Sequence, residues 1–177
     1  MTAILPETVE AFVEEGRNGA TTAVQGRALE DLICYVFAQT PGISITRRNE
    51  LNAFQTEEID VALWNDGHAD GFFFLPNIIL VECKNWSNRV SSAELNWFDS
   101  KLRNRGLAFG VLVAARGITG DAAELTAAHS IVAAALRERR RLVIINCDEL
   151  LALTESSQLV QLIKEKLCDL AVKGTVA

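Results

Sequence analysis

The sequence predicts an α/β fold in which helices and strands alternate around one sheet. Residues 22–39 carry apolar side chains at helical spacing, which indicates a core helix. Residues 78–81 are four consecutive apolar residues that lead into Glu82 and Lys84, as expected of a buried strand. With 177 residues, 49% of them hydrophobic, the chain is long enough to bury one core.

Composition divides the chain near residue 20. Residues 1–20 are acidic and contain few large apolar side chains, so we expect an N-terminal appendage or oligomer contact with a short helix over residues 7–15. Residues 21–177 show no internal repeat and no low-complexity linker, and we expect them to form a single domain.

The next elements follow from hydrophobic spacing and from turn residues. The core helix ends before Pro41 and Gly42, and the strands after it show alternating or continuous apolar residues. The turn-rich segment 65–71 joins the second and third strands as a hairpin or a longer loop. The predicted elements are a helix at 22–39, strands at 43–48, 58–64 and 78–84, and a loop at 49–55.

The C-terminal half continues the alternation. Ser91 and Glu94 resemble a capping box, which starts a helix that runs to about Asn104 and ends at Arg105 and Gly106. An apolar run and an alanine-rich segment then predict a buried strand and a helix. The remaining predicted elements are strands at 109–115 and 142–146 and helices at 121–139, 148–153 and 157–172.

Charge and cysteine content limit the possible functions. A net charge of −6 is unfavourable for tight nonspecific binding of nucleic acid by a monomer, because phosphate binding depends on Lys and Arg. Basic residues nevertheless cluster locally, for example at 84–89 and 101–105. The four scattered cysteines show no CxxC spacing and indicate reduced core thiols. The acidic N-terminus and the absence of a long apolar run predict a cytoplasmic protein without a membrane segment.

Two carboxylates and a lysine stand at the ends of two predicted neighbouring strands. Glu82 and Lys84 are two residues apart and therefore share one strand face, whereas Cys83 points the other way. Charged side chains after so apolar a strand are costly to bury without a compensating ion or partner charge, and Asp60 on the preceding strand is a candidate partner. Hard oxygen ligands of this kind suit Mg2+ or Mn2+.

This pattern resembles the PD-(D/E)xK nuclease superfamily, in particular its Mrr-like restriction endonuclease group. Residues 26–32 are similar to the family's opening helix, residues 85–98 to the helix after its lysine, and residues 106–120 to its next strand and loop. The resemblance covers roughly Gln25 to Asp121. It implies a restriction-endonuclease-like αβββαβ core, with a central mixed sheet flanked by helices and additional terminal helices.

The resemblance also implies roles for particular residues. Asp60, Glu82 and Lys84 are the expected catalytic residues. Asp60 and Glu82, with Glu30 of the opening helix and the backbone carbonyl of Cys83, are the expected ligands of Mg2+ or Mn2+. Two departures are visible: the family's frequent Gln in the next helix is missing, with Glu94 or Asn96 nearest, and Ile59 replaces the Pro before the Asp.

Candidate residues for substrate binding are indicated by the same resemblance and by local charge. The expected contacts to the nucleic acid are Asn85, Arg89, Lys101 and Arg103. Glu58 shares a strand face with Asp60, and either binds the metal, repels it or is simply exposed. The sequence around His68 and His129 shows no metal-ligand or triad spacing, so turn polarity and helix packing explain these two residues best.

The expected function is that of a Mg2+-dependent endodeoxyribonuclease, with restriction or phage defence as the setting that the resemblance implies. The expected partners are DNA, a second copy of the chain in a homodimer, and a separate recognition or sensor protein. Two alternatives remain open. One is a catalytically inactive nucleic-acid-binding or assembly module of the same fold, and the other is a structure-selective or RNA-directed nuclease.

Overall fold

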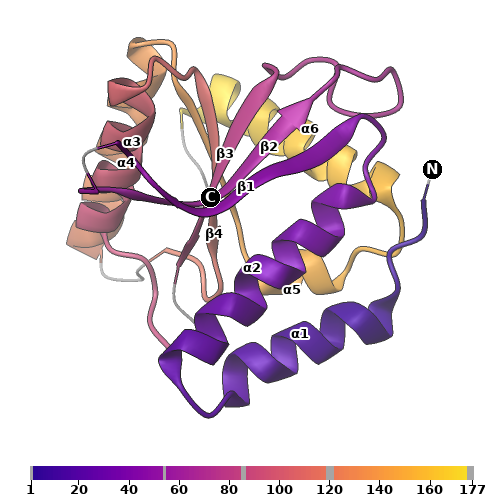
Figure 1. Ribbon diagram of the computed structural model, residues 1–177. Helices are drawn as coiled ribbons and strands as arrows, with labels where there is room; N and C mark the ends of the chain where they lie inside the picture. Colours follow the sequence, from indigo (N-terminus) through magenta and orange to yellow (C-terminus); the bar gives the residue numbers. More distant parts are fainter. Residues whose placement is uncertain (1, 54, 85–86, 119–121, 175–177) are drawn as a thin grey trace.

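The computed structural model describes residues 2–53, 55–84, 87–118 and 122–174, and helices and strands alternate along it as expected (Figure 1). The strands are β1 (Ile43–Leu51), β2 (Glu58–Asn65), β3 (Ile78–Lys84), β4 (Phe109–Ala114) and β5 (Arg141–Ile145). The helices are α1 (Pro6–Asn18), α2 (Thr22–Ala38), α3 (Ser92–Asn104), α4 (Ala122–Arg137), α5 (Cys147–Leu151) and α6 (Ser156–Lys173).

The strands form one five-stranded mixed sheet with the order β1-β2-β3-β4-β5. Strands β1, β2 and β3 are antiparallel neighbours, whereas β3, β4 and β5 are parallel and are joined through α3 and α4. The elements from α2 to β4 follow the αβββαβ order. The predicted α/β class with a central mixed sheet is therefore confirmed.

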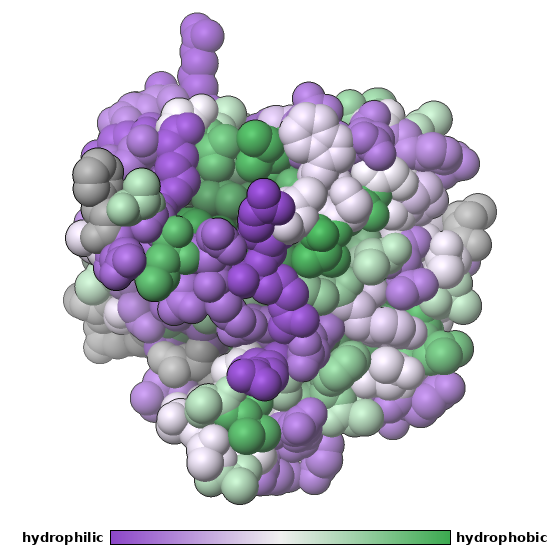
Figure 2. Space-filling model, in the orientation of Figure 1, coloured by the Kyte–Doolittle hydropathy of each residue, from purple (hydrophilic) through white to green (hydrophobic). Residues whose placement is uncertain are grey.

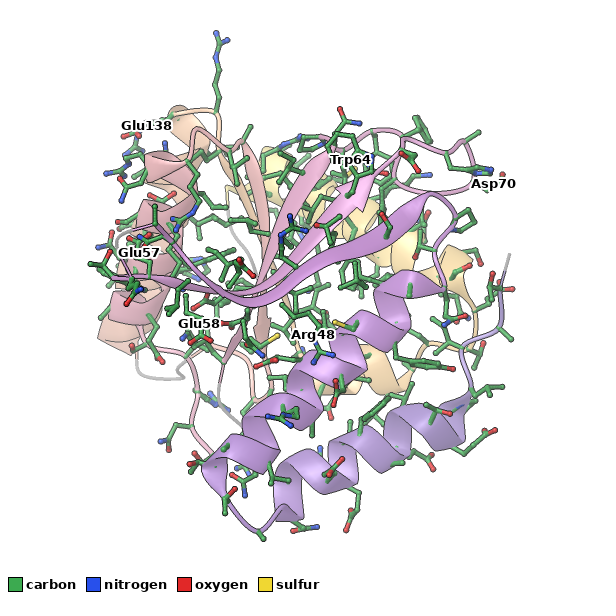
Figure 3. The ribbon with its side chains drawn as sticks, in the orientation of Figure 1. Arg48, Glu57, Glu58, Trp64, Asp70 and Glu138 are labelled. Atoms are coloured by element: carbon green, nitrogen blue, oxygen red, sulfur yellow. The ribbon has the colours of Figure 1, made fainter. Side chains whose placement is uncertain are left out.

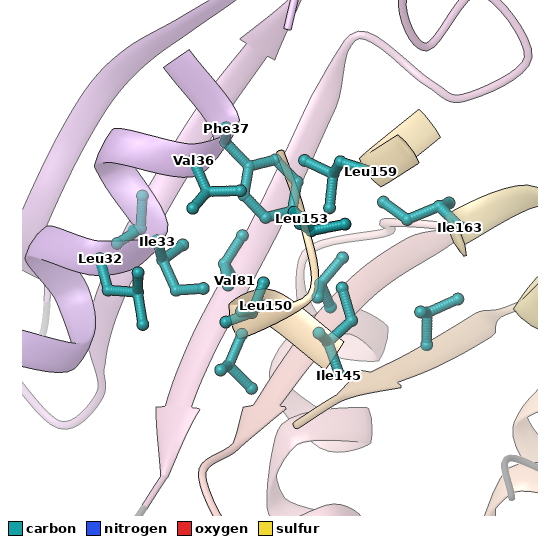
Figure 4. Close-up of a cluster of buried hydrophobic side chains, with 14 of the residues drawn as sticks. Leu32, Ile33, Val36, Phe37, Val81, Ile145, Leu150, Leu153, Leu159 and Ile163 are labelled. Atoms are coloured by element: carbon teal, nitrogen blue, oxygen red, sulfur yellow. The ribbon is translucent and has the colours of Figure 1, made fainter. Parts of the chain in front are cut away.

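Each face of the sheet is covered by its own group of helices. Val81 of β3 and Ile145 of β5 face α2, α5 and α6, where they meet Phe37 and Ile163 in the larger apolar cluster (Figure 4). Leu112 of β4 belongs to the second cluster, on the face covered by α3 and α4. Because neighbouring residues of a strand point to opposite faces, Glu82 and Lys84 lie on the α3 side.

Helix α1 packs against the rest of the chain. It is longer than the expected 7–15 helix, and Val9 and Val13 are buried together with Ile4 in the larger apolar cluster. The amphipathic spacing of these residues explains why the helix lies along α2 (Figure 1). The predicted division of the chain at residue 20 stays a prediction.

Strand β1 extends into the segment that we expected to be a loop. Glu50 and Leu51 pair with Ile59 and Glu58 of β2, so residues 49–51 belong to the strand. The register shifts between Ile45 and Arg47, and Asn49 has a positive φ of 49°. Such irregularities weaken the sequence pattern that indicates a strand. Pairing with β2 extends β1 here, and sequence alone does not specify that pairing.

The connection between β2 and β3 is held at its base by the buried Asn65. Its side-chain amide donates hydrogen bonds to the carbonyls of Phe72, Leu75 and Pro76, and its Oδ1 accepts one from the backbone N–H of Gly67. Phe72 is fully buried whereas Phe73 is 57% exposed, so the consecutive Phe residues of this connection are divided between core and surface.

The surface mixes polar and apolar side chains. Hydrophilic side chains separate several apolar areas on the face shown in Figure 2.

Within the residues that the structure describes, no helix combines the length and apolarity needed to span a membrane. All four cysteines are free thiols, and Cys168 is exposed on α6, which corrects the expectation that all four lie in the core.

Candidate active site

Asp60 and Glu82 lie one residue beyond the last registered pair of the β2–β3 ladder, Val61 and Val81. At this point a side chain replaces the backbone ladder, because Oδ2 of Asp60 accepts a hydrogen bond of 2.7 Å from the backbone N–H of Cys83. This bond ties the Asp60 carboxylate to the strand that carries Glu82. The predicted pairing of the two carboxylates on neighbouring strands is thus present in the structure.

Glu82 is buried between two ammonium groups. Its side chain is 2% exposed, and its Oε1 lies 3.0 Å from Nζ of Lys84. Nζ of Lys101 lies 2.8 Å from Oε1 and 2.7 Å from Oε2, and it also donates to the carbonyl of Glu58 at 2.8 Å. The charge of a buried carboxylate is therefore compensated by charged hydrogen bonds within the chain itself.

Lys101 reaches Glu82 because a capping box fixes the start of α3 and because α3 packs closely on β4. The capping box of Ser91 and Glu94 fixes the start of the helix. Phe98 and Leu102 are fully buried on either side of Lys101, and Gly110 of β4 leaves room for both side chains. We expected Lys101 to contact the nucleic acid, but it is 4% exposed and its ammonium is bound to Glu82.

The charges of the site perturb one another. Burial and the neighbouring charge of Glu82 raise the pKa of Asp60 to about 6, although the Cys83 hydrogen bond acts in the opposite direction. Burial alone would lower the pKa of Lys84, but Glu82 and Asp60 outweigh it, so the pKa of Lys84 is raised. Lys84 therefore carries a positive charge at neutral pH.

A pocket of ≈460 Å³ opens beside these residues and is shared by Asp60, Lys84, Glu58 and Glu30. Glu30 comes from α2 and accepts a hydrogen bond of 2.8 Å from Asn49 of β1. Its neighbour on the helix, Asp31, pairs at 2.6 Å with Arg48, which Figure 3 labels beside α2. Glu30 thus lines the same pocket as Asp60. Its carboxylate is positioned by the hydrogen bond from β1.

The donor set fits a divalent cation through two carboxylates. Among the described residues, no three His, Cys, Asp or Glu side chains lie together as metal ligands, so Glu30 does not join Asp60 and Glu82 in such a group. The neighbouring carboxylates of Asp60 and Glu82 nevertheless match the needs of Mg2+, which commonly uses one or two carboxylates and completes its shell with water and phosphate.

The expected substrate contacts lie in different places. Asn85 lies outside the described residues. Arg89 is exposed and lines a separate pocket near the end of β4. Arg103 pairs with Asp99 at 2.9 Å and lines a third pocket beside Gly106, so it does not face the pocket at Asp60.

One functional contact was missed from the sequence, namely the pairing of Lys101 with Glu82. A signal for it was present. Leu95, Phe98 and Leu102 form the apolar stripe of α3, and Lys101 stands at the edge of that stripe. A lysine at such a position needs a buried partner, but its spacing does not identify which carboxylate that partner is.

A mixed sheet that brings an Asp, a Glu and a Lys together at the ends of adjacent strands defines a nuclease of the PD-(D/E)xK class. The model of the restriction endonuclease family Mrr_cat matches residues 21–153, and the chain belongs to this family. No curated protein matches the chain.

Proposed function

We propose that the protein is a metal-dependent endonuclease that hydrolyses phosphodiester bonds of DNA, with restriction or phage defence as its biological role. The observation that carries this proposal is the grouping of Asp60, Glu82 and Lys84: Asp60 and Lys84 line one pocket, and Lys84 lies 3.0 Å from the buried Glu82. The family supports the activity of a nuclease. The metal dependence and the DNA substrate are our proposal.

We assign the following roles within this proposal. Asp60 and Glu82, together with the backbone carbonyl of Cys83, would hold Mg2+ or Mn2+. When bound, such a cation lowers the pKa of a coordinated water and offsets phosphate charge. The ammonium of Lys84 stabilises the charge that develops on the phosphate. Its raised pKa favours this electrostatic role over that of a general base, which would require a neutral amine.

A second candidate is an inactive nucleic-acid-binding or assembly module of the same fold. The observation that favours it is the contact of Lys101 with both oxygens of Glu82, because that ammonium already compensates the carboxylate. A site that is internally neutralised attracts a divalent cation less strongly. Metal binding therefore distinguishes the two candidates.

Cleavage of both DNA strands would require two sites, which a homodimer supplies. A candidate contact surface is the exposed apolar pair formed by Trp64 and Ile78, which are register partners across β2 and β3 and are 42% and 44% exposed. Contiguous exposed apolar side chains are typical of association surfaces. A separate recognition or sensor protein would supply target choice.

The proposal is tested with supercoiled plasmid, linear DNA and a labelled RNA, each incubated with Mg2+, Mn2+ or EDTA. The wild type is compared with Lys84→Ala and with Lys173→Ala, a matched variant of an exposed lysine on α6. We expect metal-dependent cutting of DNA that is lost only in Lys84→Ala. Cutting of RNA alone would replace the DNA substrate. No cutting together with no metal binding in calorimetry would establish the inactive module.

A further inference from the structure

A second, positively charged pocket lies near the candidate active site. It measures ≈490 Å³ and receives one arginine from each of three segments that are far apart in the sequence. These are Arg17 in the last turn of α1, Arg89 after β3 and Arg116 after β4. Its polar lining otherwise includes Asn146 and Asp148. Among the residues that the structure describes, the lining thus carries three arginines and one carboxylate, in a chain whose net charge is −6.

The pocket shares a wall with the strand that carries the catalytic candidates. The backbone N–H of Ala115, which lines the pocket, donates a hydrogen bond of 3.1 Å to the carbonyl of Lys84. The backbone N–H of Val90 donates one of 3.0 Å to the carbonyl of Gly117. The carboxyl ends of the parallel strands meet at this edge, where open α/β sheets bind their ligands. The pocket is therefore a neighbour of the site at Asp60.

The lining suits phosphate groups. Guanidinium groups bind phosphate oxygens in a planar, bidentate manner. All three arginines are exposed, so a ligand in solvent can reach them. The ion pair between Arg17 and Asp148 is long, at 4.0 Å, and the Asp148 side chain is 90% exposed. Such a pair is weak, and an arriving phosphate can replace it.

We propose that this pocket binds backbone phosphates of the nucleic acid, next to the phosphodiester that is cleaved at Asp60 and Glu82. The inference rests on the proposed function and adds to it a second contact region. Arg17 lies outside residues 21–153, which the family model matches. Helix α1 thus adds to the substrate-binding surface a contact from outside the matched residues.

The experiment measures binding of a fluorescein-labelled 20-base-pair duplex by anisotropy, in EDTA and from 50 to 200 mM KCl. The wild type is compared with the double variant Arg17→Ala/Arg116→Ala. The matched control is Arg137→Ala, an exposed arginine at the end of α4 and near the opposite edge of the sheet. Thermal melting verifies that each variant is folded, and Arg89→Glu provides an independent charge reversal at the same pocket.

We expect the double variant to bind about tenfold more weakly at 100 mM KCl, and the slope of log K against log salt to fall by about two. The control keeps the affinity and slope of the wild type. Wild-type affinity and slope in both Arg17→Ala/Arg116→Ala and Arg89→Glu would overturn the proposal.

Cleavage assays run in parallel separate this inference from the proposed function. Duplex binding that depends on the arginines without metal-dependent cutting would sink the catalytic proposal and keep the pocket. Cutting with arginine-independent binding would do the reverse. Absence of any duplex binding by the wild type would overturn the pocket, and the cleavage assay alone decides the proposed function.

A free nucleotide presents the same phosphate chemistry, so the wild type and the double variant are also titrated with adenosine 5′-monophosphate by calorimetry. Weak binding that disappears in the variant supports a site for backbone phosphates. A nucleotide dissociation constant below that of the duplex would assign the pocket to a free nucleotide and overturn its role in nucleic-acid binding.

Discussion

The ammonium of Lys101 lies 2.8 and 2.7 Å from the two carboxylate oxygens of Glu82. Both side chains are almost fully buried, with exposures of 5% and 2%, and they join α3 to β3. In a buried ion pair of this kind, the attraction between the two charges offsets the free-energy cost of removing both from water. When one partner is removed, the other charge stays buried without that compensation. Lys101 therefore positions Glu82 and keeps its charge compensated.

Lys101→Met is expected to lower the free energy of unfolding by about 3 kcal/mol, because Glu82 is left buried with Lys84 as its remaining ammonium partner. Urea denaturation of the metal-free protein measures this change. The double variant Lys101→Met/Glu82→Met removes both charges and should recover stability to within about 1 kcal/mol of the wild type.

The control for this cycle is Lys173→Met on the surface of α6, which should change stability by less than about 0.5 kcal/mol. Equal effects of Lys101→Met and Lys173→Met would mean that the buried pair contributes nothing to stability.

Asp60 should make the metal-free protein less stable as the pH rises. Its pKa of about 6 in the folded state lies above the ordinary value of 3.8, because burial and Glu82 disfavour the charged form. Between these two values the folded state binds more protons than the unfolded state, so the free energy of unfolding falls as the pH rises through this window. The loss is complete above the folded-state pKa.

Asp60→Asn should therefore stabilise the metal-free protein at pH 7, by about 2 kcal/mol after allowance for partial exposure. The amide oxygen of Asn can still accept the hydrogen bond from Cys83. Urea denaturation at pH 5 and pH 7 checks this, and the advantage of the variant should shrink at pH 5. A variant that is less stable than the wild type at pH 7 contradicts the assignment.

Mg2+ should stabilise the wild type through Asp60 and Glu82. A tenfold excess over the dissociation constant adds roughly 1.4 kcal/mol to the free energy of unfolding. Thermal melting with Mg2+ or EDTA measures the shift, which Asp60→Asn and Glu82→Gln should abolish. Glu149→Gln, on the short helix α5, is the control and should retain it. A shift that persists in Asp60→Asn would place the cation elsewhere.

Gly110→Val tests how closely α3 is seated on β4. A Cβ at residue 110 would lie 2.7 Å from side-chain atoms of Phe98 and Leu102, which flank Lys101 on the helix. We expect a loss of about 1 to 3 kcal/mol in urea denaturation, because the packed core has no spare volume. Gly67→Ala, at a turn position with open space but a φ of 72°, compares backbone strain with overpacking. An unchanged stability in Gly110→Val would mean that α3 adjusts freely.

Much of the fold was predictable because its signals are local. The capping box of Ser91 and Glu94 identified the start of α3, and the apolar run before Glu82 identified β3. The spacing of Glu82 and Lys84 placed both on one face without reference to any other part of the chain. The family match over residues 21–153 agrees with the resemblance that these residues indicated.

The remaining features depend on contacts between distant segments. Lys101 and Glu82 are 19 positions apart, and their contact exists only once α3 packs on β4. The extension of β1 past Asn49 likewise depends on the partner strand β2. Spacing reports which face of its own element a residue occupies, but it does not report how two elements dock.

Because of the side chain of Asn65, the geometry of the site does not depend on the length of the connection between β2 and β3. Its four hydrogen bonds close that connection at its base, while the turn at Gly67 and Asp70 is exposed beyond it. An inserted segment at the exposed tip would leave the pairing of Val61 with Val81 in place. Evolution or engineering can thus add a target-recognition module at this hairpin without moving the two carboxylates.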